Sequence, residues 1–237
     1  MKSSSHFHFK HFTVRHDRCT MKVGTDAVLL GAWVNVTDAQ SILDIGTGSG
    51  VIALVLAQRT KESVRIESVE IEKDDADQAL ENFNSSPWSS RMSVHHVPLQ
   101  EFRPSHQFDM IVTNPPYFNR SLEPPSTKRQ QVRHTTTLSY DELLSAVVRL
   151  LAENGRFNLI LPFQEALMFS ELAFRYGLFC SRRYYFKTRR EKPVERILME
   201  FTMQAKSMIE GEILLYENGL EWSPSYRGLI ADFYIKG

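Results

Sequence analysis

The chain has 237 residues, 42% of them hydrophobic and 24% charged, which is typical of a soluble globular protein with one α/β domain. Its 28 basic and 28 acidic side chains give a formal net charge of zero, so any nucleic-acid partner must be held by local basic patches. No apolar run approaches the ~18 residues of a membrane span, the first residues lack the apolar core of a signal peptide, and the two cysteines have no metal-binding spacing. We therefore expect a cytoplasmic protein with reduced thiols and with neither a membrane nor a metal partner.

The first 33 residues predict short strands followed by a helix. Over residues 6–16 hydrophobic and polar residues alternate, as in strands with one buried face. Four histidines fall in this stretch, but no ligand pattern of Asp, Glu or Cys accompanies them, so we interpret them as a polar strand face. Apolar residues then recur at helical spacing over 27–33, with Thr25 or Asp26 as the expected N-cap. Lys22 and this helix start lie either near a bound carboxylate or in solvent, and the sequence favours neither.

A glycine-rich turn follows the next predicted strand. The strand ends at Asp44, and Gly46, Gly48 and Gly50 come after it, before an apolar helix over 51–57. Glycines at this spacing allow the backbone to turn tightly and to approach a ligand closely. The order of strand, glycines and helix indicates a ligand-binding unit.

The next two strands predict further contacts to a nucleotide-like ligand. One strand ends at Glu70, where a nucleotide-binding α/β fold places the acceptor for ribose hydroxyls. Glu72 comes two residues later and more naturally opens the following helix. Ile71 would lie beside the base of the ligand. The third strand leads to loop residues around Leu99 that would border an adenine ring.

The fourth strand ends in Asn114-Pro115-Pro116-Tyr117. The two prolines stop the strand and stiffen the loop at the sheet edge where open α/β sheets bind ligands. The side-chain oxygen of Asn114 and the carbonyl of Pro115 can each accept one N–H of the exocyclic amine of adenine, which favours a pyramidal nitrogen. Tyr117 offers a ring on which a base can stack. The motif predicts a catalytic site, and the alternative is a strand-ending turn with a surface aromatic residue.

Two later segments are rich in basic residues. A polar loop over 118–139 could clamp phosphates or remain in solvent, and it contains Arg120, Lys128, Arg129, Arg133 and His134. Helices are predicted over 140–151, closed by Asn154-Gly155, and over 163–176, with strands over 156–161, 178–186 and 194–202. Between the last two strands a hairpin tip with Arg189 and Arg190 suits either an RNA backbone or solvent.

Taken together, the segment Asp44–Gly50, Glu70 and Asn114-Pro115-Pro116-Tyr117 resemble the class I S-adenosylmethionine-dependent methyltransferases that act on planar nitrogens. The resemblance implies S-adenosylmethionine as cofactor and direct in-line methyl transfer without a metal. It also implies an α/β, Rossmann-like fold whose seven-stranded, mostly parallel sheet has an antiparallel last strand and the order 3-2-1-4-5-7-6. The residues that would then bind the cofactor are Lys22, Thr25, Asp44, Gly46, Gly48, Gly50, Glu70, Ile71, Leu99 and Asn114.

A narrower resemblance covers both ends of this region. Phe9-Lys10-His11-Phe12 and residues 19–33 look like the amino-terminal signature of the bacterial tRNA(Val) adenine-N6 methyltransferases, and Arg133-His134 ahead of residues 138–144 is similar to the same family. This implies adenosine 37 of the anticodon loop as substrate and tRNA as partner. We expect a monomer, although the sequence does not fix the oligomeric state. The implied catalytic residues are Asn114, Pro115 and Tyr117, and the implied substrate contacts are Tyr117, Phe118, Arg133, His134, Arg189 and Arg190. Pro98 departs from the family pattern, because related enzymes often carry there an acid that binds the cofactor's adenine amine.

We expect a single methyltransferase domain, with an amino-terminal segment 1–38, a core 39–202 and a carboxy-terminal extension 203–237. The Asn-Pro-Pro-Tyr motif also occurs in two other classes of methyltransferase. Those that act on protein glutamine usually carry a helical amino-terminal domain, and those that act on DNA adenine are expected to add a sizeable recognition domain. We expect neither domain here, because the glycine motif begins at residue 46 and the predicted fold occupies the rest of the chain. Two alternatives to tRNA methylation are methylation of an rRNA base and RNA binding without catalysis on the same fold. A nicotinamide-dependent oxidoreductase would instead show G-x-G-x-x-G.

Overall fold

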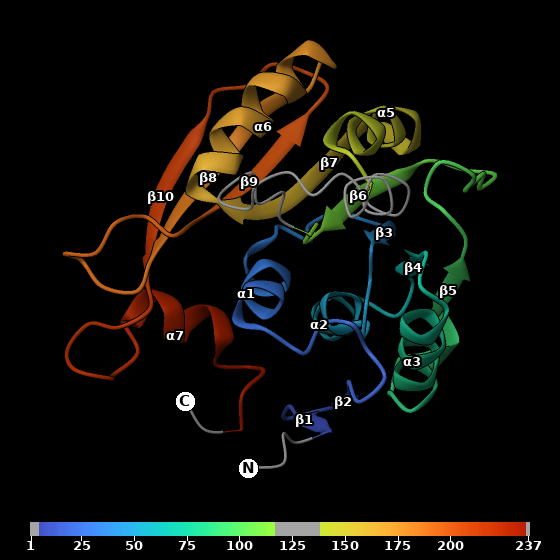
Figure 1. The fold of residues 1–237 in the computed structure, drawn as a ribbon, viewed down its shortest axis with the longest axis horizontal. Coiled ribbons are helices and arrows are strands. Elements are labelled where there is room, and N and C mark those ends of the chain that lie inside the picture. Colours follow the sequence, from blue (N-terminus) through green and yellow to red (C-terminus); the bar gives the residue numbers. More distant parts are fainter. Residues whose placement is uncertain (1–4, 117–137, 236–237) are drawn as a thin grey trace, which may run out of the picture.

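The computed structural model describes residues 5–116 and 138–235. Within these residues the fold is built on one eight-stranded mixed sheet with the order β10-β8-β9-β7-β6-β3-β4-β5 (Figure 1). Its strands are β3 (Ser41–Ile45), β4 (Arg65–Glu70), β5 (Met92–His96), β6 (Phe108–Thr113), β7 (Leu151–Pro162), β8 (Phe179–Lys187), β9 (Arg196–Thr202) and β10 (Ile209–Leu214).

The strand order confirms the predicted methyltransferase sheet. Numbered from β3, the first seven strands stand in the order 3-2-1-4-5-7-6. Only β9 runs against its neighbours, because it is antiparallel to both β7 and β8, whereas all other pairs in this sheet are parallel. The eighth strand, β10, was not predicted. Half of its residues are exposed and two of them are Glu, so the segment lacks the apolar pattern of an internal strand.

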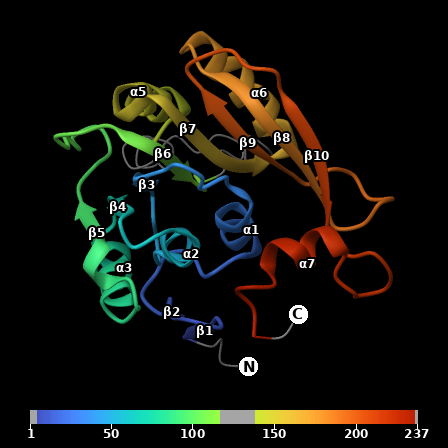
Figure 2. The same ribbon diagram turned by 180° about the vertical axis from the view of Figure 1, so that it is seen from behind.

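Helices cover both faces of this sheet, as parallel strands require. Figures 1 and 2 show α1, α2 and α3 on one face and α5 and α6 on the other. Their bounds are α1 (Thr25–Trp33), α2 (Val51–Arg59), α3 (Lys73–Asn84), α5 (Tyr140–Leu150), α6 (Phe163–Arg175) and α7 (Pro224–Ile230), with a short 3₁₀ helix at Ser89–Arg91. Successive residues of β3 point to opposite sides, so Ile42 packs in the core under α1 and α2 while Leu43 packs in the core under α5 and α6.

The two ends of the described chain meet on the side of α2 that faces away from the sheet, at the bottom of Figure 1. The strands β1 (His6–His8) and β2 (Thr13–Arg15) form a separate antiparallel pair. After β1, Phe9 bridges to Tyr234, and the Lys10 amide donates to the carbonyl of Phe233 at 2.8 Å. The carboxy-terminal extension therefore packs on the amino-terminal segment as well as adding β10 to the sheet.

One predicted boundary was wrong. Asn154-Gly155 does not close α5, because the helix ends at Leu150 and β7 begins at the next residue. β7 pairs with β6 first at Leu151 and again from Arg156, and the residues between them form an irregularity inside the strand. A Gly following Asn resembles a helix end in sequence, but here both residues lie within the irregular part of β7.

Candidate active site

The carboxyl ends of β3, β4 and β6 meet at one edge of the sheet. Ile45 stands in register with Val69 of β4 and with Thr113 of β6. The Thr113 hydroxyl donates to the carbonyl of Ile45 at 2.8 Å, which ties the ends of β3 and β6 together. Because each of these residues is followed directly by a predicted site residue, the register brings Gly46, Glu70 and Asn114 to the same edge.

The glycine turn between β3 and α2 is held firmly by its neighbours. The Gly46 amide donates to the carbonyl of Val69 at 2.9 Å, and the Gly48 amide donates to Glu70 Oε2 at 2.9 Å. Gly48 has a φ of 52°, and a methyl group added to it would meet nothing within 4 Å among the described residues. The turn therefore presents bare backbone to open space, as a surface that receives a ligand must.

Glu70 lies at the end of β4 and is only 6% exposed. Besides the Gly48 amide, it accepts the amides of Ile71 and Glu72 through Oε1, at 2.8 and 3.0 Å. Burial raises the pKa of Glu70, while these three amides oppose that rise. Glu72 is the N-cap of α3, as predicted, so Glu70 is the acid that faces the glycine turn.

Asp44 is completely buried at the end of β3. Its Oδ2 accepts the Thr47 hydroxyl at 2.6 Å, whereas its Oδ1 has no hydrogen-bond partner within the described part of the chain. Burial raises the pKa of Asp44 to about 7, and the bond from Thr47 opposes this. Thr47 was missed in the sequence, although an Asp followed by Thr three residues later is a recognisable local hydrogen-bonding pattern.

Asn114 follows β6 directly and is partly buried. Its side-chain Oδ1 is shielded from solvent and accepts no hydrogen bond from any residue that the structure describes. A buried acceptor without a donor is unfavourable by about 1–3 kcal/mol, so this atom fits a ligand N–H. Pro115 is buried and Pro116 exposed. Tyr117, Phe118, Arg133 and His134 lie outside the described residues.

The amino-terminal site residues lie at the start of α1. Lys22 and Thr25 are both exposed. The prediction that Thr25 or Asp26 caps the helix was wrong, because Gly24 occupies the N-cap in an extended conformation without a side-chain bond. Asp26 instead forms an ion pair with Arg196 of β9, with 2.8 Å between Oδ2 and Nε. The pair joins α1 to the sheet beside the candidate site.

Two further predicted cofactor residues differ in exposure. Ile71 is 48% exposed directly after Glu70, so its side chain is free to lie against a ligand. Leu99 is 5% exposed and packs in the core with Phe102. Leu99 can therefore offer a ligand little more than its backbone, whose carbonyl accepts Arg149 Nη2 at 3.3 Å.

The basic hairpin tip between β8 and β9 reaches the same sheet edge, because β8 is parallel to the central strands. Arg189 lies over the Tyr216 ring at 5.5 Å, and Arg190 is 3.9 Å from Glu217 with 78% of its side chain exposed. Both partners belong to the carboxy-terminal extension, which the sequence did not connect with this hairpin.

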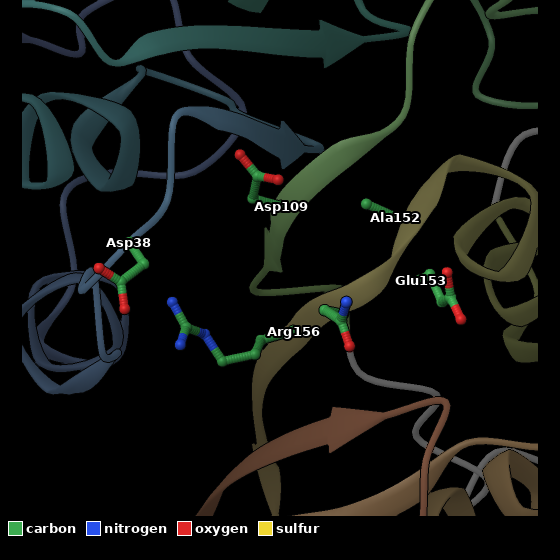
Figure 3. Close-up of a pocket in the computed structure, with 6 residues that line it drawn as sticks. Asp38, Asp109, Ala152, Glu153 and Arg156 are labelled. Atoms are coloured by element: carbon green, nitrogen blue, oxygen red, sulfur yellow. The ribbon is translucent and has the colours of Figure 1, made fainter.

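A shallow pocket lies at the opposite edge of the sheet (Figure 3). Asp109, near the start of β6, accepts the Gln40 and Ser41 amides at 2.8 and 3.0 Å, and Arg156 donates to the carbonyl of Thr37 at 2.5 Å. Figure 3 shows Arg156 extending toward Asp38. These groups join strand starts to the preceding loop, so we interpret the pocket as structural. Across residues 5–116 and 138–235 there is no cluster of three potential metal ligands and no helix of the length and apolarity needed to cross a membrane.

Comparison with solved structures supports the fold. A predicted O-methyltransferase from Agrobacterium tumefaciens superimposes with a TM-score of 0.65 at 16% identity, covering 88% of this chain and 96% of that one. A glycopeptide N-methyltransferase complexed with S-adenosylmethionine gives a TM-score of 0.57 at 11% identity, covering 77% of this chain and all of the other. Residues 19–162 match the family model of the methyltransferase small domain. Fold, glycine turn and family model define an S-adenosylmethionine-dependent methyltransferase.

Sequence comparison narrows the family. A protein of Trichodesmium erythraeum named tRNA1(Val) (adenine(37)-N6)-methyltransferase is 43% identical, covering 97% of this chain and 98% of its own length. A protein of the same name from Yersinia pestis is 41% identical over 97% of this chain and 93% of its own. This chain belongs to the tRNA1(Val) (adenine(37)-N6)-methyltransferase family.

Proposed function

We propose that this enzyme transfers a methyl group from S-adenosylmethionine to N6 of adenosine 37 in the anticodon loop of tRNA1(Val). The observation that carries the proposal is the buried Oδ1 of Asn114 at the end of β6, beside the glycine turn, which has no hydrogen-bond partner among residues 5–116 and 138–235. An acceptor at this position has no use within the described fold. It suits an N–H donor that approaches the glycine turn from outside.

In this proposal Asn114 and Pro115 orient the target amine. Asn114 Oδ1 and the carbonyl of Pro115 each accept one N–H, which turns the nitrogen lone pair toward the methyl donor. Tyr117 stacks on the base and Phe118 supports it. When bound, the cofactor supplies an electrophilic methyl group, so the protein contributes mainly position and fixed dipoles. An unpaired loop base suits this site, since the target must leave its stack.

The residues present fit the cofactor. Gly46 and Gly48 leave open space in front of their backbone, and Glu70 stands beside them as an acceptor for hydroxyl groups. The same site would include Lys22 and Thr25 for the carboxylate end, with the rest of the cofactor against Ile71 and the backbone of Leu99. The other two predicted residues, Asp44 and Gly50, would shape the turn from within, because Asp44 is completely buried and Gly50 lies against Phe83.

Substrate contacts would come from both sides of this edge. Arg189 and Arg190 at the hairpin tip, together with Arg133 and His134, are the proposed phosphate contacts. Because the net charge is zero, such local groups must supply the attraction to RNA. We propose a cytoplasmic monomer, in keeping with a tRNA substrate and with two free cysteines.

We further propose one domain, with segment 1–38, core 39–202 and extension 203–237. Its support is that the extension adds β10 beside β8 and packs α7 on α1, while its last described residues contact the amino-terminal segment. All three parts thus share one packed unit.

The test is methyl transfer from labelled S-adenosylmethionine to bulk tRNA from a strain that lacks this gene, followed by nucleoside analysis. We expect N6-methyladenosine with the wild type. Asn114→Ala should lower kcat at least ~100-fold, by analogy with loss of a transition-state hydrogen bond, with the affinity for S-adenosylhomocysteine nearly unchanged. Asn154→Ala, an exposed amide at the opposite sheet edge, is the matched control and should behave as wild type.

Two outcomes would contradict the proposal. Labelling of protein or rRNA in place of tRNA would retain the fold and cofactor but refute the substrate. Loss of cofactor affinity in Asn114→Ala, at undiminished kcat, would show that Asn114 serves the cofactor alone.

A further inference from the structure

A buried amide on α3 joins two segments that the proposed cofactor site needs. Asn82 is 2% exposed. Its Nδ2 donates to the carbonyl of Ser49 at 2.8 Å and to the carbonyl of Arg15 at 2.8 Å, and its Oδ1 accepts the Arg15 amide at 2.9 Å. Every polar atom of the side chain is therefore used. The amide pairs with both backbone groups of Arg15, as a neighbouring strand would.

The contact to Ser49 acts on the glycine turn. Ser49 stands between Gly48, whose amide is held by Glu70, and Gly50, whose amide donates to the carbonyl of Thr47 at 2.8 Å. The bond from Asn82 fixes the turn from its other side. The next residue, Phe83, packs so closely on Gly50 that an added methyl group would lie 2.5 Å from its ring. Asn82 and Phe83 together set the position of the turn relative to α3.

The contact to Arg15 acts on the segment that leads to α1. From Arg15 the chain follows α3, where the Thr20 amide donates to Asp75 Oδ1 at 2.9 Å and Arg18 pairs with Glu81 at 2.5 Å. The chain then passes through Lys22 and Gly24 to Thr25 at the start of α1. Lys22 and Thr25 are the proposed contacts to the carboxylate end of the cofactor. β2 packs beside α3, as Figure 1 also shows. The face of α3 that bears Asp75, Glu81 and Asn82 thus supports residues 15–20.

We propose that Asn82 is a positioning residue for cofactor binding, which holds the glycine turn and residues 15–24 in one fixed arrangement. The inference rests on the proposed cofactor site, since both segments contribute residues to it. No other described side chain is hydrogen-bonded to the backbone of both Arg15 and Ser49. Without this amide, the glycine turn and residues 15–24 should move independently of each other. Affinity for the cofactor should then fall, because binding must first restore their relative arrangement.

The test compares Asn82→Ala and Asn82→Asp with Asn84→Ala, which removes an exposed amide two residues further along the same helix. Calorimetry with S-adenosylhomocysteine should show binding about 10- to 100-fold weaker for Asn82→Ala. Asn82→Asp keeps the acceptor for the Arg15 amide but loses both donated bonds, so it should weaken S-adenosylhomocysteine binding as strongly as Asn82→Ala does. Asn84→Ala should bind as wild type does. In steady-state assays KM for S-adenosylmethionine should rise by the same factor, while kcat and KM for tRNA change less than about threefold.

Hydrogen exchange on the wild type gives a second test that needs no variant to fold. Addition of S-adenosylhomocysteine should slow exchange both in 44–52 and in 13–24. Protection confined to 44–52, or unchanged affinity in a folded Asn82→Ala, would overturn the inference while leaving the proposed function standing. Absence of binding by the wild type would instead refute the proposed cofactor site.

Discussion

Two glycines of the same turn should respond to the same substitution in different ways. Gly48 has a φ of 52° and open space in front of it, whereas Gly50 has a φ of 81° and lies against the ring of Phe83. A left-handed conformation disfavours any L-residue by about 1–2 kcal/mol, so both alanine variants lose that much stability. Only Gly50→Ala also overfills the core, because the new methyl group would lie 2.5 Å from the Phe83 ring.

The magnitudes follow from these two terms. Overpacking adds about 1–3 kcal/mol, so Gly50→Ala should lose about 2–5 kcal/mol in all and Gly48→Ala about 1–2. For a protein of this size, 1 kcal/mol corresponds to a Tm change of about 2–4 °C. Gly48→Ala should thus melt about 2–8 °C lower and Gly50→Ala about 4–20 °C lower than wild type.

Ligand binding should show the reverse ranking. A methyl group on Gly48 extends into the space where the cofactor must approach the backbone, so affinity for S-adenosylhomocysteine should fall at least ~10-fold. Gly50 faces Phe83 and not that space, so folded Gly50→Ala should retain most of its affinity. Thermal melts with and without S-adenosylhomocysteine, combined with calorimetry, measure both quantities. Unchanged affinity in Gly48→Ala would show that no ligand passes over this turn and would refute the reasoning.

Three further predictions concern charge. Burial raises the pKa of Asp44 to about 7, so the folded state holds a proton that the unfolded state releases near the ordinary pKa of ~3.9. This group therefore lowers stability as pH rises from about 4 to 7. Urea titrations should show a flatter dependence of stability on pH for Asp44→Asn, and an unaltered dependence would contradict this. Arg91 is 5% exposed and donates to the carbonyls of Ala57 and Thr60 at the end of α2 and to that of Val64 directly before β4. Arg91→Met should therefore lose about 2–4 kcal/mol of stability without weakening cofactor binding, as denaturation and calorimetry can check. The double variant of Arg189→Ala and Arg190→Ala should raise KM for tRNA several-fold and reduce its salt dependence, and a KM equal to that of wild type at low salt would remove the hairpin tip from the substrate site.

Within the candidate site, sequence predicts well the positions of those residues that are set by their neighbours in the chain. The glycine turn follows its strand directly, and Asn114 follows another, so strand ends and turn chemistry identify both. The parallel register of β3, β4 and β6 then brings them together. Glu70 was predictable for the same reason, because it ends the strand beside the turn.

The errors and omissions involve contacts between distant residues. Asn82 lies 67 residues from Arg15 and 33 from Ser49, so no local pattern marks it. Local rules made Thr25 or Asp26 the helix cap, but Asp26 is engaged with Arg196, 170 residues away. β10 escaped prediction because its charged residues have partners on β8, such as Lys187 with Glu212 at 2.5 Å. In each case a tertiary partner outweighed a local preference.

The unusual Pro98 has a structural reason that also depends on distant contacts. Its carbonyl accepts the amides of Glu101 and Phe102 at 2.9 and 3.2 Å, which closes a tight turn directly after β5. Arg149 of α5 donates to the carbonyl of Phe102 at 2.8 Å, and Gln100 donates to Glu142 of α5 at 3.0 Å. The loop that would border the cofactor's adenine is therefore fixed on α5. Glu142 also belongs to the capping box that begins this helix, directly after the segment containing the proposed substrate contacts. Gln100, in the loop expected to border the adenine, and Ser139, at the start of α5, thus both bond to Glu142 in the first turn of that helix.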